Sequence, residues 1–207
     1  MDKNEAQKII FNCAKLYQQN FVNKNLLFVC RKNSHINIVE TVFLTTNFLH
    51  MTGVKFEEGK EISPRDFYEL CTNKRLGVNQ FIMADNHTTE MKLMVLPGLL
   101  CKDMSARMMG NFNSNKPMLY TDKLIGGVCG GIGFVKNKNS DFYFPNTVLK
   151  EDIRNLVDET QQIIAVLRKD KTDNIYTEVI RKASQININD YIFPDEYKYI
   201  QTLLDFG

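Results

Sequence analysis

One histidine lies in a sequence setting where it could exchange protons with a substrate. His50 follows the apolar residues Phe48 and Leu49 and precedes Met51, and Thr52 is two positions further on. Histidine suits general acid or base catalysis because its charge changes near neutral pH. In an extended segment, Thr52 would project to the same side as His50 and add a hydrogen-bond donor. The competing interpretation is a structural histidine whose ring is hydrogen-bonded inside the protein.

The segment from Tyr143 to Arg154 is a candidate anion site. Its sequence predicts a strand followed by a helix over 149–157, with Asn146 or Thr147 as the capping residue. The first backbone N–H groups of a helix lack partners within the helix, so helix starts bind anions, and Lys150 would add positive charge. The same pattern is also typical of an ordinary helix cap that binds no ligand.

A glycine-rich run extends from Gly126 to Gly133 and contains five glycines. Its spacing matches neither the phosphate loop G-x-x-x-x-G-K-[ST] nor the dinucleotide fingerprint G-x-G-x-x-G. We therefore interpret it as a bulged or closely packed strand, in which Cβ atoms would clash with their neighbours.

The sequence carries no motif for a metal ion or a cofactor, and we expect neither. It contains no H-E-x-x-H string and no paired acidic motif of the kind used in two-metal phosphodiester chemistry. The five cysteines are scattered and none forms a C-x-x-C pair, so neither a zinc site nor a disulfide framework is expected. We expect any hydrolysis or group transfer to proceed without a metal.

Short helices and short strands follow one another without regular alternation, which predicts the α+β class. Apolar residues at helical spacing and helix-start signals predict helices over 3–20, 63–72, 99–109, 149–157 and 196–204. Alternating or β-branched segments predict strands over 25–30, 36–43, 89–96, 118–121, 124–131, 133–135, 142–145, 163–167 and 176–180.

Length and composition indicate one folded domain with appendages. The 207 residues are 43% hydrophobic, which is enough for a sizeable core. The net charge of +2 neither demands nor excludes a nucleic-acid partner, so any basic surface must be local. No signal-peptide pattern and no run of roughly 18 apolar residues is seen, so we expect a cytoplasmic protein without a membrane partner.

Several segments in combination resemble one phage-associated family. They are the segments 47–54 (NFLHMTGV), 63–70 (SPRDFYEL), 92–97 (KLMVLP) and 133–134, with 144–154 (FPNTVLKEDIR). They resemble the fourth phage-associated group of barnase–EndoU–colicin–RelE-like (BECR) nuclease domains, from phages and mobile elements of Firmicutes. The resemblance implies an α+β fold with a small antiparallel sheet and packed helices. We expect a single BECR-like domain over 1–170, with a C-terminal hairpin and helix extension over 171–207 packed on it.

The resemblance also implies a metal-independent ribonuclease that acts on host RNA, with tRNA as one candidate. In such enzymes the RNA 2′-hydroxyl attacks the adjacent phosphodiester, with a base, an acid and cationic groups assisting. Transferred to this sequence, His50 is the acid or base and Thr52 a donor to the phosphate, with Tyr120 and Thr121 as further catalytic partners. The residues assigned to phosphate or RNA binding are Lys92, Asn146, Thr147, Lys150 and Arg154.

Two other functions stay open, because the charge is nearly neutral and the chain extends beyond the recognisable region. The protein could be a non-catalytic phage protein that binds a host defence or immunity component, which predicts a conspicuous exposed apolar patch. It could also be a nucleotide-binding transferase in which a strand-borne H-x-T motif positions a ribose. The ribonuclease hypothesis instead predicts that His50, Thr52 and a basic residue meet in one cleft.

Overall fold

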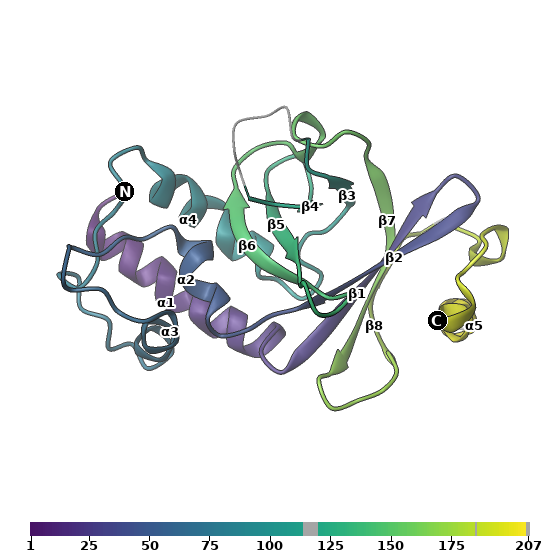
Figure 1. Ribbon diagram of the computed structural model, residues 1–207, viewed down its shortest axis with the longest axis horizontal. Coiled ribbons are helices and arrows are strands. Elements are labelled where there is room, and N and C mark those ends of the chain that lie inside the picture. Colours follow the sequence, from purple (N-terminus) through teal and green to yellow (C-terminus); the bar gives the residue numbers. More distant parts are fainter. Residues whose placement is uncertain (114–119, 185, 206–207) are drawn as a thin grey trace.

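A computed structural model describes residues 1–113, 120–184 and 186–205. Within these ranges the chain forms five α-helices and eight strands, so the predicted α+β class is confirmed. Figure 1 shows three layers: a group of helices, a strongly curved sheet, and a C-terminal helix on the far side of the sheet.

The N-terminal helix and the hairpin after it form where the sequence predicts them. Helix α1 spans Lys3–Asn20, and the Asp2 side chain accepts a hydrogen bond from the backbone N–H of Glu5 at its start. Its buried residues recur at helical spacing, which places one face of the helix in the core. Strands β1 (Lys24–Lys32) and β2 (His35–Val42) then pair as an antiparallel hairpin.

The eight strands form one sheet that curls until it meets itself. The strand order is β1-β2-β6-β5-β4-β3-β7-β8, and β1 also pairs with β7, so seven strands close into a ring. The pairing of β2 with β6 is parallel and the other pairings are antiparallel. The remaining strands are β3 (Met108–Asn111), β4 (Lys123–Gly126), β5 (Gly131–Lys136), β6 (Tyr143–Leu149), β7 (Gln161–Asp170) and β8 (Glu178–Lys182).

One side of the long strands packs against the helical layer. Helices α2 (Asn47–Thr52), α3 (Pro64–Thr72) and α4 (Thr88–Leu99) join α1 there (Figure 1). Successive side chains of β1 point to opposite faces of the sheet, so the strand contributes to two separate parts of the core. Phe28 and Cys30 belong to the apolar cluster on the helical side.

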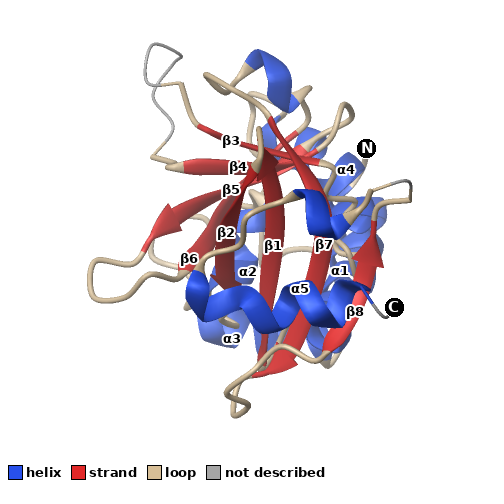
Figure 2. Ribbon diagram, turned by 90° about the vertical axis from the view of Figure 1, so that its right-hand side faces the viewer, coloured by secondary structure: helices blue, strands red, loops and turns tan. Residues whose placement is uncertain are grey.

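The opposite face of β1 and β7 is covered by the end of the chain. Two short 3-10 turns (Ile188–Asp190 and Asp195–Tyr197) lead into α5 (Lys198–Asp205), which crosses in front of these strands in Figure 2. Ile200 and Leu204 of α5 are fully buried in a cluster with Leu27 and Val29 of β1.

Two predicted elements are wrong because their local pattern was ambiguous. The segment predicted as a strand over 89–96 is helix α4, whose buried residues Thr89, Leu93 and Leu96 follow helical spacing. The segment predicted as a helix over 99–109 contains only the end of α4, a turn and the start of β3.

The predicted helix over 149–157 is also wrong. Strand β6 continues through Leu149, and only a single 3-10 turn follows, over Ile153–Asn155. The β-branched residues Thr147 and Val148 are buried in the sheet, so burial outweighs the helix-cap pattern at this point.

Candidate functional site

His50 is carried on helix α2 and not on a strand. Phe48 and Met51 of α2 are buried in the core, which leaves His50 exposed on the outer side of the same helix. Gly53 ends the helix with a left-handed φ of 71°, a conformation that favours glycine.

Thr52 cannot contact a substrate, so its predicted role as a phosphate donor is wrong. The residue is 0% exposed, and its hydroxyl donates to the carbonyl oxygen of Leu49 at 2.8 Å. The helical geometry is the reason, because residues two apart on a helix do not share a face.

Lys92 of α4 reaches the end of α2. Its Nζ donates to the carbonyl oxygen of His50 at 2.9 Å, where the last carbonyls of a helix lack intrahelical partners. Burial, together with the smaller effect of the positive charge of Lys55, lowers the pKa of Lys92 to about 8. The structure therefore brings His50 together with one of the predicted basic residues, and this amine is partly neutral at slightly alkaline pH.

This arrangement predicts a pH dependence of stability that depends on Lys92. The folded pKa lies below the unfolded value of 10.5, so between about pH 8 and 10.5 the unfolded chain holds more protons on this amine. Below this pH window the folded protein holds Lys92 as a buried, charged ammonium, which lowers the free energy of unfolding. This destabilisation disappears as the pH rises through the window. Between pH 7 and 10, wild type should therefore gain about 1 to 2 kcal/mol of unfolding free energy relative to Lys92→Met.

Urea unfolding at several pH values measures this difference. Methionine keeps the length of the buried stem, and Lys15→Met on the exposed face of α1 serves as the control. Parallel pH profiles for wild type and Lys92→Met would contradict the assignment of a buried, destabilising charge at Lys92.

Four other predicted residues gather along β6. The Asn146 side-chain amide donates to the carbonyl oxygen of Tyr120 at 2.7 Å, and Tyr120 as a whole is 79% exposed. Thr121 and Thr147 flank Gly133 of β5, where an added Cβ would lie 2.8 Å from an atom of each side chain. The Thr121 hydroxyl oxygen is buried without a hydrogen-bond partner among the described residues.

The predicted anion site at a helix start does not form. Asn146 and Thr147 lie inside strand β6, so no helix begins there to offer free backbone N–H groups. Lys150 is exposed just after β6, with its Nζ 3.3 Å from the sulfur of Met94 in α4. Arg154 is bound by Asp152 at 2.5 Å, which neutralises its charge and makes it a weak candidate for RNA binding.

Helices α2 and α4, which carry His50 and Lys92, both pack against β6 (Figure 1). We use the name β6 site for the predicted residues on and around these three elements. It comprises His50, Lys92, Tyr120, Thr121, Asn146, Thr147 and Lys150.

Lys123 is a partly buried cation to which the sequence-based prediction assigns no role. It lies on the same face of β4 as the buried Ile125, and its Nζ donates to Asn111 Oδ1 at 2.8 Å and lies 5.4 Å from the Tyr143 ring centroid. Burial lowers the pKa of Lys123. A lysine at a strand position in register with core residues is the signal that could have identified it.

The glycine-rich run is the turn of the hairpin formed by β4 and β5, so the single strand predicted over 124–131 is wrong, while the predicted close packing of its glycines is confirmed. A Cβ on Gly126 would lie 2.3 Å from the carbonyl oxygen of Gly130, and one on Gly131 would lie 2.7 Å from Ile153. Side chains at these positions would therefore force the strands apart.

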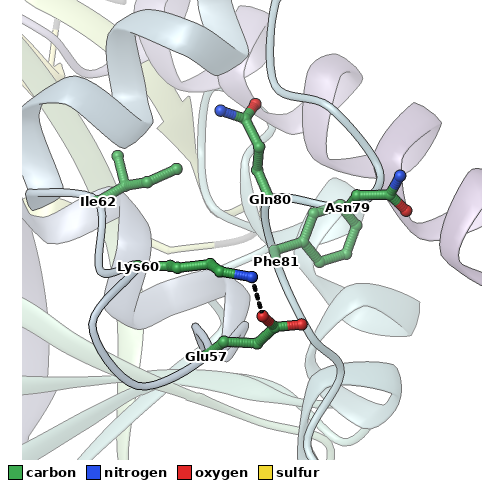
Figure 3. Close-up of a pocket in the computed structure, with 6 residues that line it drawn as sticks. All are labelled: Glu57, Lys60, Ile62, Asn79, Gln80 and Phe81. Atoms are coloured by element: carbon green, nitrogen blue, oxygen red, sulfur yellow. Dashed lines mark hydrogen bonds and ion pairs between the residues drawn. The ribbon is translucent and has the colours of Figure 1, made fainter.

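A separate hollow of about 190 Å³ contains no residue of the β6 site (Figure 3). Its two charged groups, Lys60 and Glu57, form an ion pair at 2.5 Å and neutralise each other. Phe81 and Ile62 supply the apolar part of its lining. We assign no chemistry to it.

Two further properties concern only the parts of the chain that the structure describes. No three His, Cys, Asp or Glu side chains there are grouped so that they could hold a metal ion. No helix in these parts is long and apolar enough to cross a membrane.

Comparison with known proteins gives one match. A family model described as phage-Barnase-EndoU-ColicinE5/D-RelE like nuclease4 matches residues 9–185. No curated protein and no solved structure matches the chain. The matched range contains the whole β6 site and stops before α5.

Proposed function

The chain belongs to the phage-Barnase-EndoU-ColicinE5/D-RelE like nuclease4 family, and we propose on this premise that it is a metal-independent endoribonuclease. Family membership supports a nuclease-like function with a nucleic-acid substrate. Our proposal adds that the substrate is host RNA, tRNA included, and that the protein acts as a phage or mobile-element effector in the bacterial cytoplasm. Cleavage would proceed by attack of the RNA 2′-hydroxyl on the adjacent phosphodiester.

The observation that carries this proposal is the pairing of His50 with Lys92. The imidazole of His50 is exposed, so a substrate can reach it, and it lies at the helix end where the Lys92 ammonium is held. An exposed imidazole can remove the 2′-hydroxyl proton or protonate the leaving oxygen. In the proposed mechanism the Lys92 ammonium, held on the backbone carbonyl oxygen of His50, would stabilise the extra negative charge of the phosphorane.

The remaining groups of the β6 site suit the binding of single-stranded RNA. The exposed ring of Tyr120 offers a face on which a base can stack, and Asn146 holds the backbone of Tyr120 in place. Lys150 is exposed and can neutralise a backbone phosphate.

The test is incubation of the purified protein with total bacterial RNA, a tRNA pool and single-stranded DNA, all in EDTA. We expect cleavage of RNA but not of DNA, because DNA lacks the attacking 2′-hydroxyl. The 5′ fragments should end in a 2′,3′-cyclic phosphate. Intact RNA, or equal cleavage of DNA, would contradict the proposed reaction.

A second candidate function is non-catalytic binding of a host defence or immunity protein. One observation favours it, namely a groove of about 440 Å³ beside the glycine-rich turn with exposed apolar residues. Met94 is 55% exposed and Val128 57% exposed, and both line this groove. Exposed apolar surface of this kind is typical of a protein-binding site. Intact RNA together with capture of a defence protein that Met94→Asp abolishes would favour this function.

A further inference from the structure

The ring of seven strands is apolar inside and polar at one end. Its interior holds Cys30, Met109, Ile125 and Phe134, which are buried in the cluster on the helical side. Strand pairing and the two-residue repeat of a strand place further side chains on the same inner face. The polar ones among them are Asn37, Asn111, Lys123, Tyr143 and Gln161, and each is at least partly exposed. A ligand can therefore reach this end of the ring from solvent.

Lys123 supplies a positive charge at this end, and it has no counter-ion. Its Nζ donates to Asn111 Oδ1 at 2.8 Å and lies 5.4 Å from the Tyr143 ring centroid, and both of these partners are uncharged. No carboxylate among the described residues lies within ion-pair distance of this ammonium. The acidic residue next to it in the chain, Asp122, accepts instead from the backbone N–H of Lys136 at 2.6 Å.

A partly buried ammonium without a counter-ion is unfavourable for the folded protein, because burial removes water that would otherwise stabilise the charge. Burial is the largest cause of the lowered pKa of Lys123, which agrees with this cost. An anion bound beside the Lys123 ammonium would replace the lost water and neutralise the charge.

The neighbouring amides add hydrogen-bond donors. Asn111 uses its side-chain oxygen to accept from Lys123, so its two amide N–H groups remain without an acceptor among the described residues. Gln161 likewise accepts at its side-chain oxygen, from Asn37 at 3.0 Å, and its amide N–H groups are also left over there. A ligand that fits this end carries negative charge and several acceptor oxygens. A phosphate group has both properties.

We infer that Lys123 and Asn111 form a binding site for a phosphate group, and that in the working protein this phosphate belongs to the nucleic-acid backbone. The choice of nucleic acid as the source rests on the proposed function. Tyr143, whose ring lies under the Lys123 ammonium, is the first residue of β6. A nucleic-acid strand held here would therefore run beside the β6 site, and the contact would add affinity without taking part in bond cleavage.

Two substitutions remove the free charge in different ways. Lys123→Met removes the ammonium and keeps an apolar stem of similar length. Asn111→Asp keeps the lysine and gives it an internal counter-ion, because the replaced oxygen lies 2.8 Å from Nζ. Lys8→Met and Asn4→Asp, at exposed positions of α1, are the matched controls, because they change the net charge by the same amounts at a distant place.

Binding of two probes tests the inference without any need for cleavage. The probes are inorganic phosphate and a labelled 12-nucleotide single-stranded DNA, both in EDTA and at equal ionic strength. We expect Lys123→Met and Asn111→Asp each to weaken binding of the 12-nucleotide probe about three- to tenfold, with both controls unchanged. Inorganic phosphate should raise the unfolding temperature of wild type more than that of either variant. Without ligand, both variants should unfold at the wild-type temperature or above it, which separates a binding effect from a folding defect.

The two probes distinguish the source of the phosphate. Weaker binding of both probes, or of the oligonucleotide alone, would support a site for the nucleic-acid backbone. Weaker binding of inorganic phosphate with unchanged oligonucleotide binding would overturn that assignment, and equal binding of both probes by wild type and variants would overturn the site itself. The deoxy probe cannot be cleaved by 2′-hydroxyl attack, so failure of the ribonuclease proposal would not hide the result.

Discussion

His50→Ala is expected to lower the rate of RNA cleavage by about a hundred- to ten-thousandfold, the range typical for loss of a general acid or base. The imidazole is the exposed titratable group at the end of α2, and alanine at this position has no means of moving a proton. Because the side chain is exposed, the substitution should change the free energy of unfolding by less than about 0.5 kcal/mol. Initial rates on a tRNA pool and a urea unfolding curve measure the two quantities.

The matched control is His35→Ala, which removes an exposed histidine at the turn between β1 and β2. Wild-type activity of His35→Ala would show that cleavage depends on the histidine at position 50 and not on any exposed histidine. A further test is the dependence of the RNA cleavage rate on pH. In His50→Gln, the part of this dependence that requires the imidazole should be absent. Full activity of His50→Ala, with unchanged stability, would remove His50 from the proposed mechanism.

The fold was predictable from sequence where one pattern dominated a segment. Helix α3 begins at Ser63 and Pro64 as predicted, with the Ser63 hydroxyl oxygen accepting from the Asp66 N–H at 3.1 Å. The hairpin of β7 and β8 is likewise confirmed. Helix α4 was missed because Glu90, Met91, Lys92 and Leu93 alternate over too few residues to separate the two periods.

The candidate site was predictable only in part, because its geometry depends on contacts between distant segments. The sequence identifies His50 and Lys92 separately, but their 42-residue separation hides the contact that α2 and α4 create. The role assigned to Thr52 assumed an extended segment, and the helical turn places that hydroxyl in the core.

Ile200→Ala is expected to lower the free energy of unfolding by about 2 to 5 kcal/mol, as is usual when a buried isoleucine is truncated. Ile200 is 0% exposed and packs in the cluster that α5 forms over β1 and β7. Thr202→Ala, on the exposed side of the same helix, is the control and should change stability by less than about 0.5 kcal/mol. Urea unfolding followed by far-ultraviolet circular dichroism measures both variants.

The size of this effect decides what the C-terminal segment contributes. The family match ends at residue 185, yet the sheet face beneath α5 is apolar, with Leu27, Val29 and Leu167 fully buried by it. Such a face is unfavourable in water, so an extension outside the matched range must cover it in this chain. A loss under about 1 kcal/mol in Ile200→Ala would contradict this, because it would mean that α5 is only loosely docked. A loss in the expected range, with RNA cleavage by the folded variant unchanged, would assign α5 to stability and leave catalysis to the β6 site.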